Sequence, residues 1–165
     1  MVFDKLFTRL QCIRKFTDSK SILLEFNPEI MHIYKIHNDY INGINNKLVL
    51  KTFDNNSYIK HMIYENKFLD CYVIFWKPNA VSLIHDHSDN GCLLKVLNGS
   101  LKEEVYNKNN NKLNLVKINN LDKKNIGYID NTIGYHRIIN PNDTNVCSIH
   151  IYSPPNYKAN IFNIR

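Results

Sequence analysis

Residues 92–106, CLLKVLNGSLKEEVY, decide the class of fold. Two runs suited to β-strands, 92–97 and 101–106, flank Asn98-Gly99, a pair that favours the tight turn of a β-hairpin because both residues tolerate positive φ. From about residue 55 onward, short runs rich in Tyr, Ile, Val and Phe alternate with Asn, Asp and Gly. Further strands are predicted at residues 71–76, 113–118, 126–130 and 146–152. This series of short strands predicts a mainly β fold, a small barrel or sandwich.

The N-terminal part of the chain has a different periodicity. Apolar residues recur at helical spacing over residues 3–16, which predicts an amphipathic helix. Asn27-Pro28-Glu29 is a favourable helix start, and we expect a second helix over residues 28–41 that ends at Asn42-Gly43. The sequence therefore predicts one domain over residues 1–165, with a helical cap in residues 1–45 and a β-barrel in residues 55–162.

The composition excludes several classes of protein. A chain of 165 residues with 44% hydrophobic residues suits one globular domain. It has no run of about 18 apolar residues, so we expect no membrane partner. The net charge of +6 is spread along the chain and interrupted by acidic residues. We therefore interpret it as a solvated basic surface, and expect no nucleic-acid partner.

The cysteines and the N-terminus indicate a compartment. The four cysteines include no CxxC pair, so neither a zinc finger nor a thioredoxin motif is supported. The first residues are charged and do not form the apolar stretch of a signal peptide. We therefore expect a cytoplasmic protein with reduced thiols.

Three histidines are candidate metal ligands. His85 and His87 flank Asp86, and in a strand residues i and i+2 point to the same face, so both imidazoles can reach one ion while Asp86 points away. His136 lies downstream on another β-like segment. Three neutral nitrogens suit Zn, Fe, Cu or Ni, so the residues alone leave the ion open, and two unrelated histidines are the alternative explanation of the first pair. The remaining histidines apart from His150 are read as surface or helix-face residues; these are His32, His37 and His61.

Ser148, His150 and Tyr152 share one face of a predicted strand, because they are two residues apart. A hydroxyl, an imidazole and a phenol in a row can form a hydrogen-bonded relay that tunes Tyr152 as an acid–base group. The alternative is a polar stripe on the barrel wall with no chemical role.

Four motifs in this order resemble the cysteine dioxygenase family: IHDH at residues 84–87, CLLKVLNG at 92–99, GYHR at 134–137 and HIYSPP at 150–155. Members of that family are cupins, small jelly-roll-like β-barrels with a helical N-terminal region. The resemblance implies a role for each of nine residues: iron ligands His85, His87 and His136; a thioether crosslink between Cys92 and Tyr152; the relay residues His150 and Ser148; and the substrate-binding pair Tyr58 and Lys60.

The resemblance also implies a reaction, the conversion of L-cysteine and O2 to cysteine sulfinic acid with Fe(II) as cofactor. Three imidazoles leave three positions of a six-coordinate iron open, and cysteine can supply its thiolate and its amine. We expect the partners to be a small thiol and O2, and the protein to be a monomer.

Lys60 is the main departure from the family, which has Tyr-x-Arg where this chain has Tyr58-Ile59-Lys60. A lysine fixes a carboxylate less well than the two-pronged guanidinium of arginine. The same chemistry on another small thiol, 3-mercaptopropionate or cysteamine, is therefore an alternative. A metal-binding cupin without catalysis is a second alternative. A zinc-dependent isomerase or hydrolase would leave Cys92 and Tyr152 unexplained.

Overall fold

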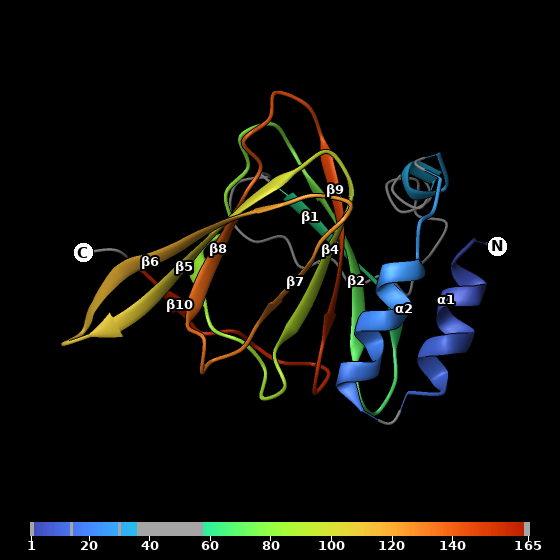
Figure 1. The fold of residues 1–165 in the computed structure, drawn as a ribbon, viewed down its shortest axis with the longest axis horizontal. Coiled ribbons are helices and arrows are strands. Elements are labelled where there is room, and N and C mark those ends of the chain that lie inside the picture. The colour runs from blue at the N-terminus through green and yellow to red at the C-terminus, as the bar shows by residue number, and fades with distance from the viewer. Residues whose placement is uncertain (1, 14, 30, 36–57, 164–165) are drawn as a thin grey trace.

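The computed structural model describes residues 2–13, 15–29, 31–35 and 58–163. Two antiparallel sheets face one another, and short helices pack against the outer side of one of them (Figure 1). The helices are α1 (Val2–Gln11), the 3-10 helix η1 (Phe16–Asp18) and α2 (Ser19–Glu25). The strands are β1 (Tyr58–Glu65), β2 (Asp70–Trp76), β3 (Ile84–His85), β4 (Cys92–Asn98), β5 (Leu101–Asn109), β6 (Lys112–Leu121), β7 (Ile126–Ile129), β8 (Tyr135–Ile139), β9 (Val146–Tyr152) and β10 (Ile161–Phe162). Within the described ranges, no helix has the length and apolar character that a membrane span needs.

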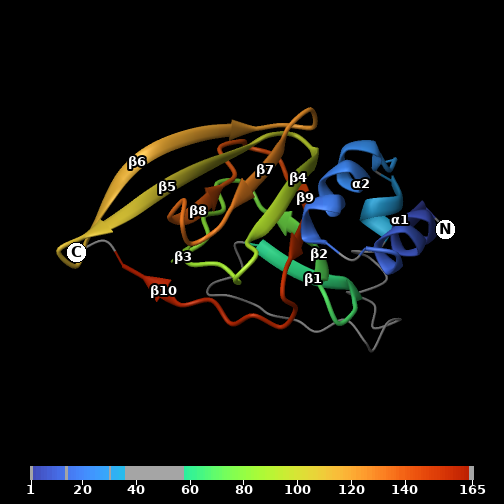
Figure 2. The same cartoon turned by 60° about the horizontal axis from the view of Figure 1, so that its bottom comes forward.

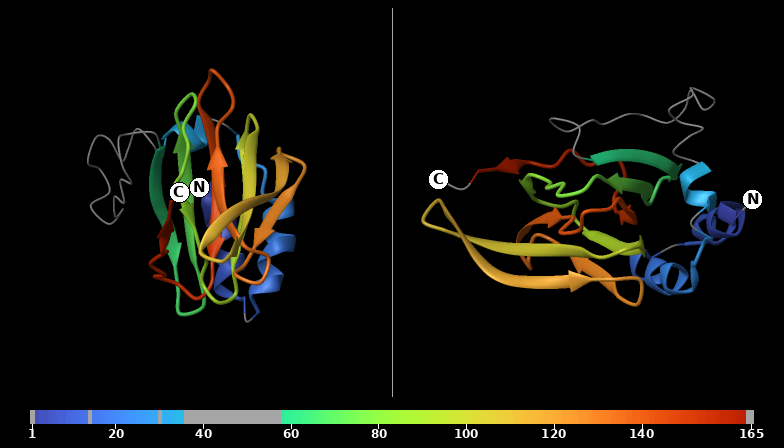
Figure 3. Two further views of the ribbon diagram at one scale, coloured as in Figure 1. Left: turned by 90° about the vertical axis from the view of Figure 1, so that its left-hand side faces the viewer. Right: turned by 90° about the horizontal axis from the view of Figure 1, so that it is seen from above.

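The strand order is that of a jelly-roll barrel. One sheet has the order β1-β2-β9-β4-β7 and the other has the order β10-β3-β8-β5-β6, so the chain crosses repeatedly between the sheets. Figure 3 shows the two layers facing one another. Figure 2 shows the helices at one end of the molecule and the tip of the β5–β6 pair at the other. The prediction of a mainly β, jelly-roll-like barrel with an N-terminal helical cap is confirmed.

The central strands of the first sheet are buried on both faces. Every residue of β2 is buried, which explains why its sequence is an almost continuous apolar run rather than an alternating one. Cys71, Val73 and Phe75 belong to the core that the sheet shares with the helices. Tyr72 and Trp76, on the opposite face, point into the barrel. The even-numbered positions of β2 and its neighbours therefore line the interior, where the candidate site lies.

A buried lysine joins the helical cap to the barrel. Lys95 on β4 is 2% exposed. Its Nζ donates hydrogen bonds to the carbonyl oxygens of Leu23 and Phe26, both at 2.9 Å, and to Asn27 Oδ1 at 3.0 Å. The last carbonyls of a helix have no partner within the helix. Lys95 supplies that partner at the end of α2 and so fixes the cap on the sheet.

The predicted hairpin at Asn98-Gly99 is wrong, although the turn exists. β4 pairs with β7 and β9, whereas β5 pairs with β6 and β8, so the turn connects the two sheets. Gly99 has φ +70°, and a Cβ there would lie 2.8 Å from Val146 Cγ2. Asn98 Oδ1 accepts the backbone N–H of Cys147 at 2.7 Å. The two residues therefore serve a crossover beside β9 rather than a hairpin.

The helical predictions are correct in kind and wrong in extent. The first helix ends at Gln11 rather than at residue 16. Helix α2 was not predicted, because its seven residues are too few to show a clear periodicity. Residues 31–35 of the predicted second helix are helical and residues 28 and 29 are not. The rest of that prediction, including Asn42-Gly43, lies outside the described residues.

Candidate metal centre and cavity

Three histidines converge inside the barrel, as the sequence predicted. The nitrogens that His85, His87 and His136 offer lie within 4.8 Å of one another. His85 ends β3, His136 stands on β8, and these two residues are direct partners in the sheet. His87 lies in the loop beyond β3, so the strand argument does not apply to it. Asn131 fixes that loop instead, by accepting from the His87 backbone N–H and donating to its carbonyl, both at 2.8 Å.

The hydrogen bonds around the imidazoles fit a bound cation. His85 Nδ1 lies 2.8 Å from the Leu83 carbonyl, and His136 Nδ1 lies 2.7 Å from Glu103 Oε1, so each Nδ1 carries the proton. The two Nε2 atoms then present lone pairs to each other at 3.2 Å. Nitrogens that each lie about 2.1 Å from one metal ion have this separation. A metal ion bound by both nitrogens would replace this repulsion with coordination.

His87 supports the same conclusion. Both of its ring nitrogens are buried and lack a hydrogen-bond partner among the described residues. Leaving a buried polar group unpaired is costly, whereas a metal ion would satisfy it. Burial, together with the neighbouring imidazoles, lowers the pKa of His87 to about 2, and burial lowers the pKa of His136 well below its usual value. The rings are therefore neutral, the form that binds metals.

Glu103 is a functional candidate that sequence reasoning missed. Its Oε1 accepts from His136 and its Oε2 accepts from Asn119 Nδ2 at 2.7 Å. Carboxylates that hold the second nitrogen of a ligating histidine fix its tautomer and orientation. A signal was present in the sequence, because Glu103 shares the interior face of β5 with Leu101 and Val105, and all three are buried.

The predicted relay is present and extends further than expected. Tyr152 Oη lies 3.4 Å from His150 Nδ1, and His150 Nε2 lies 2.9 Å from Ser148 Oγ. Trp76 Nε1 donates to Ser148 Oγ at 2.9 Å. Because Ser148 Oγ accepts the indole N–H, its own hydroxyl proton is available to donate to His150 Nε2. His150 Nδ1–H can then donate to the phenol oxygen of Tyr152. Burial lowers the pKa of His150 well below its usual value, so this histidine is neutral.

Cys92 lies beside the end of the relay. Its Sγ is 3.8 Å from His150 Nδ1, and the residue is 2% exposed. Cys92 and Tyr152 are direct partners across β4 and β9. Burial raises the pKa of the Cys92 thiol to about 12, so the thiol is protonated at neutral pH.

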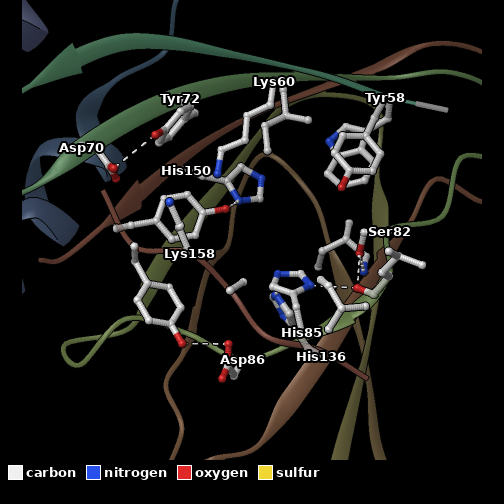
Figure 4. Close-up of a pocket in the computed structure, with 18 residues that line it drawn as sticks. Tyr58, Lys60, Asp70, Tyr72, Ser82, His85, Asp86, His136, His150 and Lys158 are labelled. Atoms are coloured by element: carbon white, nitrogen blue, oxygen red, sulfur yellow. Dashed lines mark hydrogen bonds between the residues drawn. The ribbon is translucent and has the colours of Figure 1, made fainter. Parts of the chain in front are cut away.

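A cavity of about 350 Å³ opens onto His85 and His136, and both predicted substrate-binding residues line it (Figure 4). Lys60 Nζ lies 3.9 Å from the ring centroid of Tyr72 and 4.0 Å from that of Tyr152. A cation over an aromatic face is attracted by the electrons of the ring. Tyr58 packs against Trp76, with 4.7 Å between the ring centroids and a tilt of 31° between the ring planes. Lys60 is therefore directed into the cavity rather than into bulk solvent.

The segment after β9 forms another wall of the cavity. Asp86 Oδ1 accepts from Tyr157 Oη at 2.8 Å and from the Asn160 backbone N–H at 2.7 Å, while Oδ2 accepts from Asn160 Nδ2 at 2.7 Å. Ile161 on β10 then pairs with His85 on β3. Asp86 is thus not one of the converging groups, as predicted, and instead holds residues 157–160 against the ligand loop.

The other histidines differ from prediction in one case. His32 is exposed, with a side-chain exposure of 46%. His61 was predicted to be a surface or helix-face residue, which is wrong. It is fully buried on β1, in edge-to-face contact with Phe75 at 5.4 Å. No strand was predicted at residues 58–65, so no alternating pattern indicated that the His61 side chain is buried. His37 lies outside the described residues.

Solved structures with a similar fold include two oxalate decarboxylases. Oxalate decarboxylase from Lactobacillus farciminis superposes with a TM-score of 0.58 at 17% identity, over 71% of this chain and 34% of the other. Oxalate decarboxylase from Bacillus subtilis, in a study of its Mn(II) centres, gives a TM-score of 0.55 at 12% identity, over 68% and 30%. At these identities the likeness concerns the fold alone, and the fold is that of the cupin barrel.

The chain belongs to the cysteine dioxygenase type I family, whose profile matches residues 9–165. Cysteine dioxygenase type 1 of Rattus norvegicus is 33% identical over 108 residues, which are 62% of this chain and 54% of the relative. The Danio rerio protein of the same name is 33% identical over 119 residues, 68% of this chain and 59% of the relative. The chain thus spans about half the length of the curated relatives it matches.

Proposed function

We propose that this protein is a single-domain, iron-dependent thiol dioxygenase that converts L-cysteine and O2 to cysteine sulfinic acid. The observation that carries the proposal is the all-histidine cluster. Among the described residues the cluster includes no carboxylate, and it opens onto a cavity whose wall includes Lys60 and Lys158. A site whose ligands are all neutral leaves the charge of the ion uncompensated, so an anionic thiolate is a suitable substrate group. Membership in the family supports the same reaction.

A ferrous ion held by His85, His87 and His136 would supply the positions at which a thiolate and dioxygen meet. Both oxygen atoms of O2 end on the sulfur of the substrate, so the reaction needs no external reductant. Glu103 would keep His136 in the tautomer that presents Nε2. The apolar barrel interior would exclude water while sulfur is being oxidised.

Lys60 would bind the substrate carboxylate as a point charge, with the faces of Tyr72 and Tyr152 behind it. Tyr58, held by its contact with the Trp76 ring, would add a hydroxyl at the same wall. Tyr152 would hold a proton at its Oη close to the reacting groups, with His150 and Ser148 maintaining its orientation. In the mature protein Cys92 would be joined to Tyr152, which would lock that ring in place.

The second candidate is the same reaction on 3-mercaptopropionate or cysteamine. Lys60 supports it, because a flexible single cation orients a carboxylate less strictly than a guanidinium does.

The test is oxygen uptake by the ferrous-loaded monomer with L-cysteine, with the product mass measured in parallel. We expect one O2 consumed for each sulfinate formed, and His136→Ala should lose both iron and activity. Uptake only with another thiol would select the second candidate. Bound iron without uptake for any thiol would contradict the dioxygenase function and leave a metal-binding cupin without catalysis. Full iron and activity in His136→Ala would contradict the ligand set.

A further inference from the structure

We propose that Asp70 is a specificity-determining residue of the cavity, which disfavours thiols that carry a carboxylate without an amine and so selects amino thiols. The inference rests on the proposed thiol dioxygenase function and names the substrate class of that site. Asp70 was not a candidate in the sequence, where it precedes the apolar run of β2.

The carboxyl group of Asp70 is held at the cavity wall. The residue lines the cavity and is 2% exposed. Its Oδ2 accepts the Asn156 backbone N–H at 2.8 Å and the Tyr72 hydroxyl at 3.2 Å, which fixes the orientation of the carboxylate. Its Oδ1 is buried and has no hydrogen-bond partner among the described residues. A buried carboxylate oxygen without a partner attracts a cationic group and repels an anionic one.

Asp70 and Lys60 meet at the same aromatic side chain. The hydroxyl of Tyr72 donates to Asp70, and the face of its ring lies 3.9 Å from Lys60 Nζ. Figure 4 shows the three residues along one wall, apart from His85 and His136. Burial raises the pKa of Asp70, and the hydrogen bond from Asn156 and the charge of Lys60 both oppose that rise. A substrate carboxylate that approaches Lys60 therefore approaches the charge of Asp70 as well.

The two charges distinguish three small thiols. 3-Mercaptopropionate carries only a carboxylate, so it gains from Lys60 and is penalised by Asp70. Cysteamine carries only an amine, and its cationic form is attracted by Asp70. L-Cysteine carries both groups, so the effects of Asp70 on them offset each other. Coulomb interactions across a cavity with protein walls are strong enough to alter these affinities severalfold.

Asp70→Asn removes the charge and keeps the shape of the side chain. Glu65→Gln is the matched control, because Glu65 is the cross-strand partner of Asp70, is exposed and does not line the cavity. Calorimetry on ferrous-loaded protein without oxygen would give the affinities for 3-mercaptopropionate and cysteamine. Asp70→Ser is the second charge-free variant and should reproduce the result of Asp70→Asn.

We expect Asp70→Asn to raise the affinity for 3-mercaptopropionate relative to cysteamine by roughly fivefold, and Glu65→Gln to change it by less than about twofold. An unchanged or lower ratio in Asp70→Asn would overturn the proposal, and so would parallel weakening of both thiols. An equal change of the affinity ratio in Glu65→Gln would also overturn it, because removing any nearby negative charge would then have the same effect. Because binding is measured without turnover, a shifted ratio in a protein that consumes no oxygen would support the role of Asp70 and refute the dioxygenase function. Oxygen uptake together with an unchanged affinity ratio in Asp70→Asn would support the dioxygenase function and refute the role of Asp70.

Discussion

Cys92 and Tyr152 lie directly opposite each other on β4 and β9, with His150 Nδ1 3.8 Å from the sulfur and 3.4 Å from the phenol oxygen. Directly opposed residues on one face of an antiparallel pair have Cβ atoms about 4.5–5.5 Å apart, which brings a thiol within reach of an aromatic ring. The barrel thus holds the two groups together before any covalent bond exists.

We predict that turnover joins Cys92 and Tyr152. Forming a bond from the sulfur to a ring carbon removes one hydrogen from each residue, with O2 as the oxidant. Mass spectrometry of recovered protein should therefore show a loss of two hydrogens in the peptides that hold this pair. Cys147→Ser, a change at a buried cysteine that packs against the helices, should keep the mass loss. Tyr152→Phe should abolish it and reduce activity without removing it, and a persistent loss in that variant would refute the pairing.

Glu103→Gln is predicted to lower metal affinity by about 10- to 100-fold, because the amide no longer holds the His136 tautomer as firmly. Glu104→Gln is the matched control, since its carboxylate binds Arg137 and Lys102 instead of a candidate ligand. Competition with a chelator of known affinity measures both variants. Equal losses of metal affinity in Glu103→Gln and Glu104→Gln would show that the effect comes from altering β5 and not from losing the hydrogen bond to His136.

Lys60→Arg is predicted to lower KM for L-cysteine by roughly tenfold, because a guanidinium can bind the carboxylate through two parallel hydrogen bonds. Lys60→Met should raise the same KM by a similar factor. Steady-state oxygen uptake with cysteamine is the control, since that thiol has no carboxylate. Parallel changes for the two substrates would rule out a role of Lys60 in carboxylate binding.

The stability of the metal-free protein is predicted to fall as the pH drops below about 6.5, the usual pKa of histidine. Burial lowers the pKa of His87 to about 2 and lowers those of His136 and His150. The unfolded chain then binds protons that the folded chain excludes, so acid favours unfolding. Each group contributes up to about 1.4 kcal/mol per pH unit until its folded pKa is reached. Urea denaturation at pH 7.5 and 5.5 measures the slope, which His150→Gln should reduce.

Lys95→Met is predicted to destabilise the protein by about 3 kcal/mol, because the buried carbonyls at the end of α2 lose their donor. Lys77→Met, at an exposed position, should have little effect on the free energy of unfolding. Urea denaturation gives that free energy, and hydrogen exchange should accelerate selectively in residues 19–25. Unchanged exchange there would mean that Lys95 does not hold the cap.

The parts of the site that were predictable carry their signal in local spacing. Ser148, His150 and Tyr152 alternate along one strand, so a short window of sequence shows that they share a face. The His-x-His spacing marks His85 and His87 as a candidate pair, although His87 lies in the loop beyond β3. Glu103 and Asp70 carry a weaker signal. Each is a charged residue on an interior face, but its significance depends on which distant strand or side chain lies opposite.

The same limit explains the errors in the fold. The turn at Asn98-Gly99 was recognisable from its residue types. Whether the two flanking strands pair with each other depends on β7, β8 and β9, which come later in the chain and pair with them instead. His61 shows the converse. On the edge strand β1 it carries no pattern of its own, yet it is fully buried and contacts Phe75 on the neighbouring strand β2.

Asp86 anchors both ends of the cavity wall formed by residues 157–160, so the two residues between the anchors can be substituted. The three hydrogen bonds that its carboxylate accepts come from Tyr157 and Asn160, whereas the intervening Lys158 and Ala159 line the cavity without a hydrogen bond to that carboxylate. A library that varies only those two positions would therefore alter the size and polarity of the entrance while the anchor points stay in place. Tests of the proposed function on bulkier thiols would therefore vary this short segment first and leave Asp86 unchanged.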